Sequence, residues 1–158
     1  MDREPGPVSP GSAVPGEPTP LRGHSALCLL GFRGRGYSPS FVERMAAVHG
    51  RLVSAPETRV LLLASPDSLC EACPNHREGC TLGGPGHEAH MRAQDAAVLA
   101  RLGLPVGATV PWAEVLRRIA ASVRGADLPG LCTTCPWLPL GWCAEGVEAL
   151  RPPAAPPP

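Results

Sequence analysis

The sequence contains no lysine, and this absence narrows the chemistry open to the protein. Without lysine it can form no Schiff base and has no lysine general base. Its 14 arginines balance 14 acidic residues, so the formal net charge is zero. A chain without excess positive charge is poorly suited to binding nucleic-acid phosphates or an anionic membrane surface. We therefore expect neither nucleic acid nor a membrane among its partners.

Long hydrophobic runs are also missing. The two longest, around residues 26–30 and 60–64, are far shorter than the roughly 20 residues that span a bilayer. The first residues are charged and then proline-rich, without the apolar segment of a secretory signal. We expect a cytoplasmic protein, in which seven cysteines favour metal binding or thiol chemistry over a disulfide framework.

The common catalytic motifs are absent. The sequence has no nucleophile elbow, no paired-histidine zinc helix and no phosphate-binding Walker loop. Its acidic residues are scattered, and no pair has a spacing typical of acid–base catalysis. The sequence alone therefore assigns no enzymatic activity.

Proline marks the ends of the chain. Residues 1–20 hold six of the 21 prolines and residues 152–158 hold five more. Such segments have too little apolar surface to offset the entropy of ordering them. We predict two disordered proline-rich tails, 1–20 and 152–158, around one cysteine-rich metal-binding domain at 21–151.

The apolar spacing between the tails predicts a small helix-dominated α+β domain. Ser40 and Glu43 have the spacing of a capping box, which predicts the start of a helix there. Residues 59–64 have the length and composition of a strand, although no partner strand is evident. Further helices are expected at 21–30, 88–102 and 112–123. We expect one or two short strands and irregular cysteine loops that metal organises.

Six of the seven cysteines form two similar clusters, and this is the strongest signal in the sequence. Each cluster reads Leu-Cys-x-x-Cys-Pro, followed by a third cysteine seven or eight residues after the second. The clusters are Cys70, Cys73 and Cys80, and Cys132, Cys135 and Cys143. Six buried cysteines without metal would not be expected at this spacing within polar loops.

The spacing suits a metal centre. Two residues between cysteines allow a tight turn that directs both sulfurs to one point, and a third cysteine adds another ligand. Proline after the second cysteine recurs in iron–sulfur sequences of the ferredoxin type. Zinc ribbons use similar Cys-x-x-Cys turns, but they combine two such pairs of cysteines and need no third cysteine in each segment. The triplets therefore favour an iron–sulfur cluster, and zinc remains the alternative.

Each triplet needs a fourth ligand. Cys28 is our first candidate, and His24 lies four residues earlier on the same face of the predicted helix. Core packing remains open for Cys28, and a structural or supporting role remains open for His24. The other nearby histidines, at 76, 87 and 90, are expected to be solvated residues first and zinc ligands second.

The sequence resembles a bacterial and archaeal family catalogued as domain of unknown function 1284. The resemblance rests on the stretch from Leu21 through Gly31-Phe32-Arg33-Gly34 to Val42, on Asp67 to Cys70 with its CxxCP loop, and on the late cysteine segment around Trp137. It extends from Leu21 to about Val147. The family has been suggested to bind iron–sulfur, so the resemblance implies a metal and no activity. Members tend to carry paired histidines, whereas this chain has Ser25 after His24.

Three functions follow as hypotheses. The first is an iron–sulfur protein that serves electron transfer with a protein redox partner, or a cluster-stabilised binding role. The second is a zinc-organised structural or interaction module. The third is a thiol-dependent enzyme that uses Cys28. A shared zinc ion would bring its sulfurs to about 3.5–4 Å from one another, whereas a cluster would spread them around a cavity.

Overall fold

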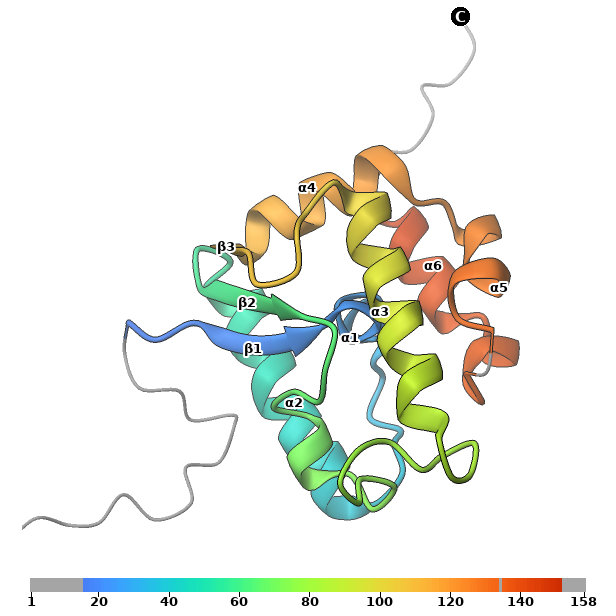
Figure 1. Ribbon diagram of the computed structural model, residues 1–158. Helices are drawn as coiled ribbons and strands as arrows, with labels where there is room; N and C mark the ends of the chain where they lie inside the picture. The colour runs from blue at the N-terminus through green and yellow to red at the C-terminus, as the bar shows by residue number, and fades with distance from the viewer. Residues whose placement is uncertain (1–15, 134, 152–158) are drawn as a thin grey trace, which may run out of the picture.

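The computed structural model describes residues 16–133 and 135–151, and within them it confirms a small helix-dominated α+β domain (Figure 1). Its three-stranded sheet has the order β1-β2-β3. Strand β1 (Thr19–Arg22) runs parallel to β2 (Arg59–Leu63), and β3 (Thr109–Pro111) runs antiparallel to β2. The six helices are α1 (Gly23–Cys28), α2 (Pro39–Ser54), α3 (His87–Leu102), α4 (Trp112–Ser122), α5 (Leu128–Leu131) and α6 (Trp142–Glu148).

Strand β2 is the strand predicted at 59–64. Its alternate residues Val60 and Leu62 are fully buried, as expected of a strand with one face on the core. Leu62 pairs with Leu21 of β1, and Val60 pairs with Val110 of β3. The sheet therefore has three strands where one or two were expected, because the two partner strands are too short to show a pattern.

The longer helices form where apolar residues recur at helical spacing. Helix α2 buries Phe41, Met45, Val48 and Leu52, and in Figure 1 it passes behind β1 and β2. Its N-cap is Ser38, whose hydroxyl accepts a hydrogen bond from the backbone N–H of Phe41. The capping box expected at Ser40 is therefore wrong, since Pro39 begins the helix one residue earlier.

The segment predicted as one helix at 21–30 is divided between three elements. It begins in β1, continues as α1 and ends in the 3₁₀ turn η1 (Leu29–Gly31). The strand begins at Thr19, two residues before the expected domain boundary. Residues 1–15 and 152–158 lie outside the described part of the chain, so the predicted tails remain predictions.

Helix α6 lies very close to η1, and glycine makes this approach possible. A Cβ atom added at Gly146 would collide with the backbone carbonyl oxygen of Leu30. A Cβ atom at Gly31 would lie 2.6 Å from the Sγ atom of Cys143. The contact between the two elements therefore also brings Cys143 next to the segment that carries Cys28.

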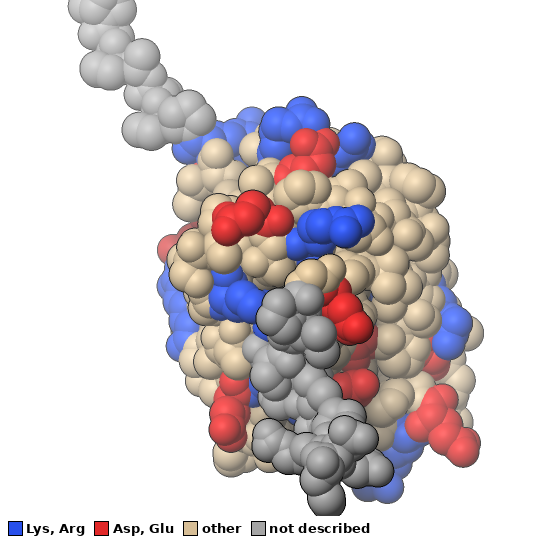
Figure 2. Space-filling model, turned by 90° about the vertical axis from the view of Figure 1, so that its left-hand side faces the viewer, with Lys and Arg blue, Asp and Glu red and all other residues tan. Residues whose placement is uncertain are grey.

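The surface carries charges of both signs. On the face drawn in Figure 2, basic and acidic side chains are interspersed among uncharged ones rather than separated by sign. Within the described residues, no helix combines the length and apolar character needed to cross a membrane.

Substitution at Gly146 should test the approach of α6. Gly146→Ala places a Cβ atom against backbone and should lower the free energy of unfolding by roughly 1–3 kcal/mol, the usual range for overpacking. Gly50→Ala is the matched control, because Gly50 lies within α2 with open space around it. The control should gain about 0.5–1 kcal/mol in helix propensity. Urea unfolding checks both values, and equal stability of the two variants would contradict the packing of α6 against η1.

Candidate metal centre

Six cysteines from three separate segments line one cavity. The cavity has a volume of about 80 Å³ and lies between α1, the first cysteine loop and the second cysteine loop. The cysteines that line it are Cys28, Cys70, Cys73, Cys80, Cys132 and Cys135. His24 also lines it, four residues before Cys28 on α1. The two clusters, which are far apart in sequence, thus face a common space.

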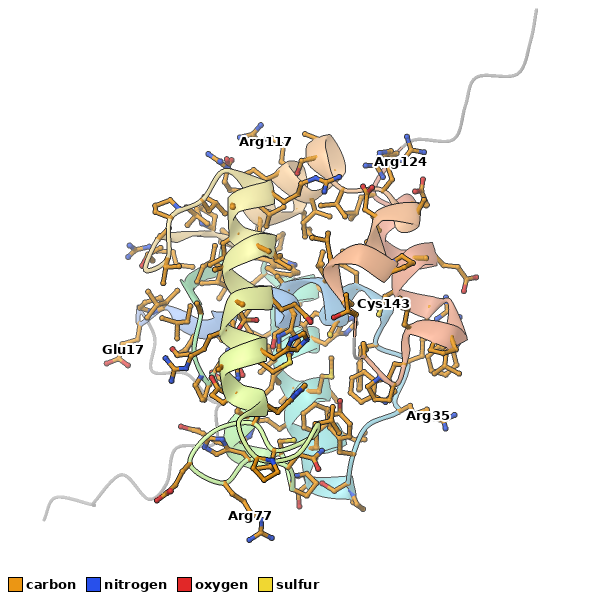
Figure 3. The ribbon with its side chains drawn as sticks, turned by 45° about the vertical axis from the view of Figure 1, so that its right-hand side comes forward. Glu17, Arg35, Arg77, Arg117, Arg124 and Cys143 are labelled. Carbon is orange, nitrogen blue, oxygen red and sulfur yellow. The ribbon has the colours of Figure 1, made fainter. Side chains whose placement is uncertain are left out.

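The seventh cysteine lies on the far side of Cys28. Cys143 lines a smaller neighbouring cavity of about 20 Å³, together with Cys28 and Gly31. In Figure 3 it lies at the start of α6, and its thiol adjoins Gly31 at the end of η1. Cys28 therefore borders both cavities. It shares the larger one with Cys135 and the smaller one with Cys143.

Electrostatic interactions group Cys28 with the second triplet. The pKa of Cys28 is raised well above its usual value by its hydrogen bond with Cys135, by burial, and by the charges of Cys135, Cys143 and Cys132. The same hydrogen bond lowers the pKa of Cys135 to about 6, against the effect of burial and with help from the backbone N–H groups of Trp137 and Leu138. The hydrogen bond thus favours a thiol at Cys28 as donor and a thiolate at Cys135 as acceptor.

The remaining thiols of this group favour their protonated form. Burial, followed by the charges of Cys135 and Cys143, raises the pKa of Cys132 to about 12. Burial and the charge of Cys135 raise the pKa of Cys143 to about 11. The group can thus hold one thiolate readily, and further deprotonation requires a nearby positive charge.

Two thiols of the first triplet also favour their protonated form. Burial raises the pKa of Cys73, and the charge of Cys80 contributes to this rise. Burial and the charge of Asp67 raise the pKa of Cys70 to about 12, although Arg22 and the backbone at Asp67 act in the opposite direction. The backbone N–H of Asn75 donates to the Sγ atom of Cys73 at 3.4 Å.

Across residues 16–133 and 135–151, no three Cys, His, Asp or Glu side chains are grouped closely enough to hold a single metal ion. The six cysteines share a cavity lining. The predicted metal-ligand role of the seven cysteines remains a prediction.

A buried arginine holds the first cysteine loop in place. Arg22, at the end of β1, is only 1% exposed. Its Nε donates to Oδ2 of Asp95 at 2.6 Å, and its two Nη atoms donate to the Glu88 carboxylate at 2.8 and 3.2 Å. One Nη also lies 3.6 Å from the Sγ atom of Cys70. Burial lowers the pKa of Arg22, but its bonds to Glu88 and Asp95 outweigh this and raise it overall.

Two carboxylates extend this network to both ends of the loop. Asp67 accepts from the backbone N–H groups of Arg22, Leu69 and Cys70, and so fixes the start of the loop. Glu88 accepts from the backbone N–H of Cys80 at 2.8 Å and so fixes its end. The sequence analysis missed the roles of Arg22, Glu88 and Asp95. The signal available in the sequence was an aspartate at position 95, on the otherwise apolar face of a predicted helix. The structure buries this side chain fully.

Aromatic side chains cover part of the cavity wall. The ring of Tyr37 stacks on Trp137 with centroids 4.6 Å apart and meets the edge of Phe41 at 5.2 Å. All three residues line the cavity. Burial, together with the charges of Cys28 and Cys135, raises the pKa of Tyr37, so its phenol stays protonated.

In the part of the chain that the structure describes, the histidines of the first loop and of α3 form no shared ligand set with the cysteines. His87 and His90 stack with centroids 5.3 Å apart on one side of α3. His87 is buried, so the expectation that it is solvated is wrong. His90 lies 3.3 Å from the hydroxyl of Thr133. His24 differs from them, because it is the histidine placed at the cavity.

Removal of the Arg22 charge should be costly. Arg22→Met leaves Asp95 and Glu88 without their buried partner and should lower the free energy of unfolding by about 3–5 kcal/mol. Arg92→Met is the matched control, because Arg92 pairs with the same Glu88 but is 54% exposed. This control should cost less than about 1 kcal/mol. Urea unfolding measures both, and a similar small loss in each variant would show that the Arg22 network does not stabilise the fold.

Comparison with known proteins agrees with the resemblance seen in the sequence. The family described as "Protein of unknown function (DUF1284)" matches residues 36–141, more than half of the chain. The match includes the cysteines from Cys70 to Cys135, but it begins after Cys28 and ends before Cys143. The chain has no significant match among curated proteins or among solved structures. On the extent of the family match, the chain belongs to the DUF1284 family.

Proposed function

We propose that this protein binds an iron–sulfur centre in the cysteine cavity and uses it for electron transfer or for a cluster-stabilised binding role. The observation that carries this proposal is the convergence of six cysteines from three segments on one cavity. A seventh cysteine adjoins it behind Cys28.

The arrangement of the sulfurs supports a cluster over a single ion. A zinc ion needs four donors at about 2–2.3 Å, and the described residues include no group of three or more side chains suited to that. An iron–sulfur cluster occupies space of its own, and its thiolate ligands surround it. Cysteines that line a cavity fit the requirement of an iron–sulfur cluster better than that of a zinc ion.

The protonation of the thiols sets a condition that a metal centre must meet. Cys70 and Cys132 have pKa values raised to about 12, so in the metal-free protein they are neutral. Ligand thiolates must be deprotonated, and metal binding supplies the positive charge that makes this favourable. The donor set thus suits a cationic centre that several cysteines neutralise together.

The surroundings of the cavity are suited to setting a reduction potential. Hydrogen bonds to sulfur and exclusion of water are two principal means by which a protein tunes such a centre. Arg22 and the backbone N–H of Asn75 donate to the sulfurs of Cys70 and Cys73. Tyr37, Phe41 and Trp137 limit the access of water.

Two alternatives use the same cysteines. A zinc-organised module would use the same cysteines after they move closer together. A thiol-dependent enzyme is favoured by the lowered pKa of Cys135, about 6, beside a donating Cys28. In that case the nucleophile would be Cys135 rather than the Cys28 expected from the sequence, because the pKa of Cys28 is raised.

Metal content of serine variants tests the proposal. The full chain, purified without oxygen, should contain iron and acid-labile sulfide and absorb visible light. Serine substitution at Cys28, Cys132 or Cys135 should lower both contents several-fold, because each removes a thiolate from the cavity. Thr133→Ala is the matched control in the same loop and should leave both unchanged, because Thr133 does not line the cavity.

Two results would contradict the iron–sulfur assignment. Stoichiometric zinc without sulfide would favour the structural module. A metal-free protein whose Cys135 alone is alkylated rapidly above pH 6 would favour the thiol enzyme.

A further inference from the structure

His24 is held at the cavity in one defined orientation. Its Nδ1 atom lies 2.6 Å from Oδ1 of Asp95, and its backbone N–H donates to the same oxygen at 3.0 Å. Asp95 is fully buried in α3, and its other oxygen accepts from Arg22. The close approach of α1 to α3 depends on Gly23, where a Cβ atom would collide with the backbone of Asp95. Both partners are thus fixed by the fold.

These bonds decide which ring nitrogen is available. Both Asp95 oxygens act as acceptors, so the proton of a neutral His24 imidazole resides on Nδ1. Nε2, on the opposite side of the ring, then carries a free lone pair. A histidine whose Nδ1–H is held by a carboxylate is the usual arrangement of a metal-ligating histidine. His24 lines the same cavity as Cys135.

A second polar side chain that lines the same cavity also indicates a bound ligand. Gln94 lines it one residue before Asp95, is only 9% exposed, and its Oε1 has no hydrogen-bond partner in the described structure. A buried acceptor left without a partner costs about 1–3 kcal/mol. The same side-chain amide carries an NH2 group, which can donate to a bound acceptor such as the sulfide of a cluster.

We propose that His24 is itself a ligand of the metal centre, through Nε2, and that Asp95 is its positioning residue. This inference rests on the proposed iron–sulfur function and makes the ligand set a mixture of cysteine and histidine. Nε2 donates its lone pair to an iron ion, while the proton on Nδ1 remains in the hydrogen bond to Asp95. A neutral imidazole in place of a thiolate leaves the centre less negative, which raises its reduction potential.

Nitrogen hyperfine coupling tests the proposal directly. The full chain, grown with isotopically labelled histidine and purified without oxygen, is reduced and examined by pulsed electron paramagnetic resonance. The centre should show a strong coupling to one histidine nitrogen, and His24→Ala should abolish it. His49→Ala is the matched control, because His49 packs against Phe32 and lines a different cavity. The control should keep the coupling unchanged.

His24→Cys provides a second readout. It should retain the iron, lose the nitrogen coupling and lower the midpoint potential, because a thiolate replaces the imidazole. A wild-type centre without histidine coupling, or a potential unchanged in His24→Cys, would overturn the proposal while the iron content still upheld the iron–sulfur function. A wild-type protein without iron and sulfide would instead refute the proposed function.

Discussion

The buried guanidinium of Arg22 is the interaction on which the first cysteine loop and the placement of His24 depend. It joins the end of β1 to two carboxylates of α3 and to the sulfur of Cys70. A buried charge of this kind is tolerated only when its donors are satisfied, which requires Glu88 and Asp95 to stay in place. Glu88 in turn holds the backbone of Cys80, and Asp95 holds His24. One ion-pair network therefore sets both the first cysteine loop and the orientation of the histidine.

The second half of the site is positioned by close backbone contact rather than by charge. Helix α6 approaches η1 because Gly31 and Gly146 have no side chains, and this brings Cys143 next to the segment that carries Cys28. Cys28 then lies between two thiols of the second triplet, and its hydrogen bond with Cys135 leaves one thiolate in a largely neutral group. A cationic centre would permit several thiolates at once, and the proposed function requires such a centre.

The sequence predicted what short-range patterns encode. Helices α2, α3 and α4 and strand β2 follow from apolar spacing, and the α+β class follows from them. Strands β1 and β3 have four and three residues, too few for a pattern, so β1 was taken for part of a helix. Cys28 was expected near one of the triplets without an indication of which, and it lies beside the second. The Arg22–Asp95 pair, in contrast, joins residues 73 positions apart. No local pattern reports such a pair, because its energy arises only when the two elements are packed together.

Anomalous X-ray diffraction from crystals grown without oxygen is the most direct test of the central claim. Data collected on both sides of the iron absorption edge should show iron density inside the cavity bordered by Cys28, Cys73, Cys80 and Cys135. Density that appears at the zinc edge alone would contradict the account, as would iron bound elsewhere on the protein while these sulfurs remain free thiols.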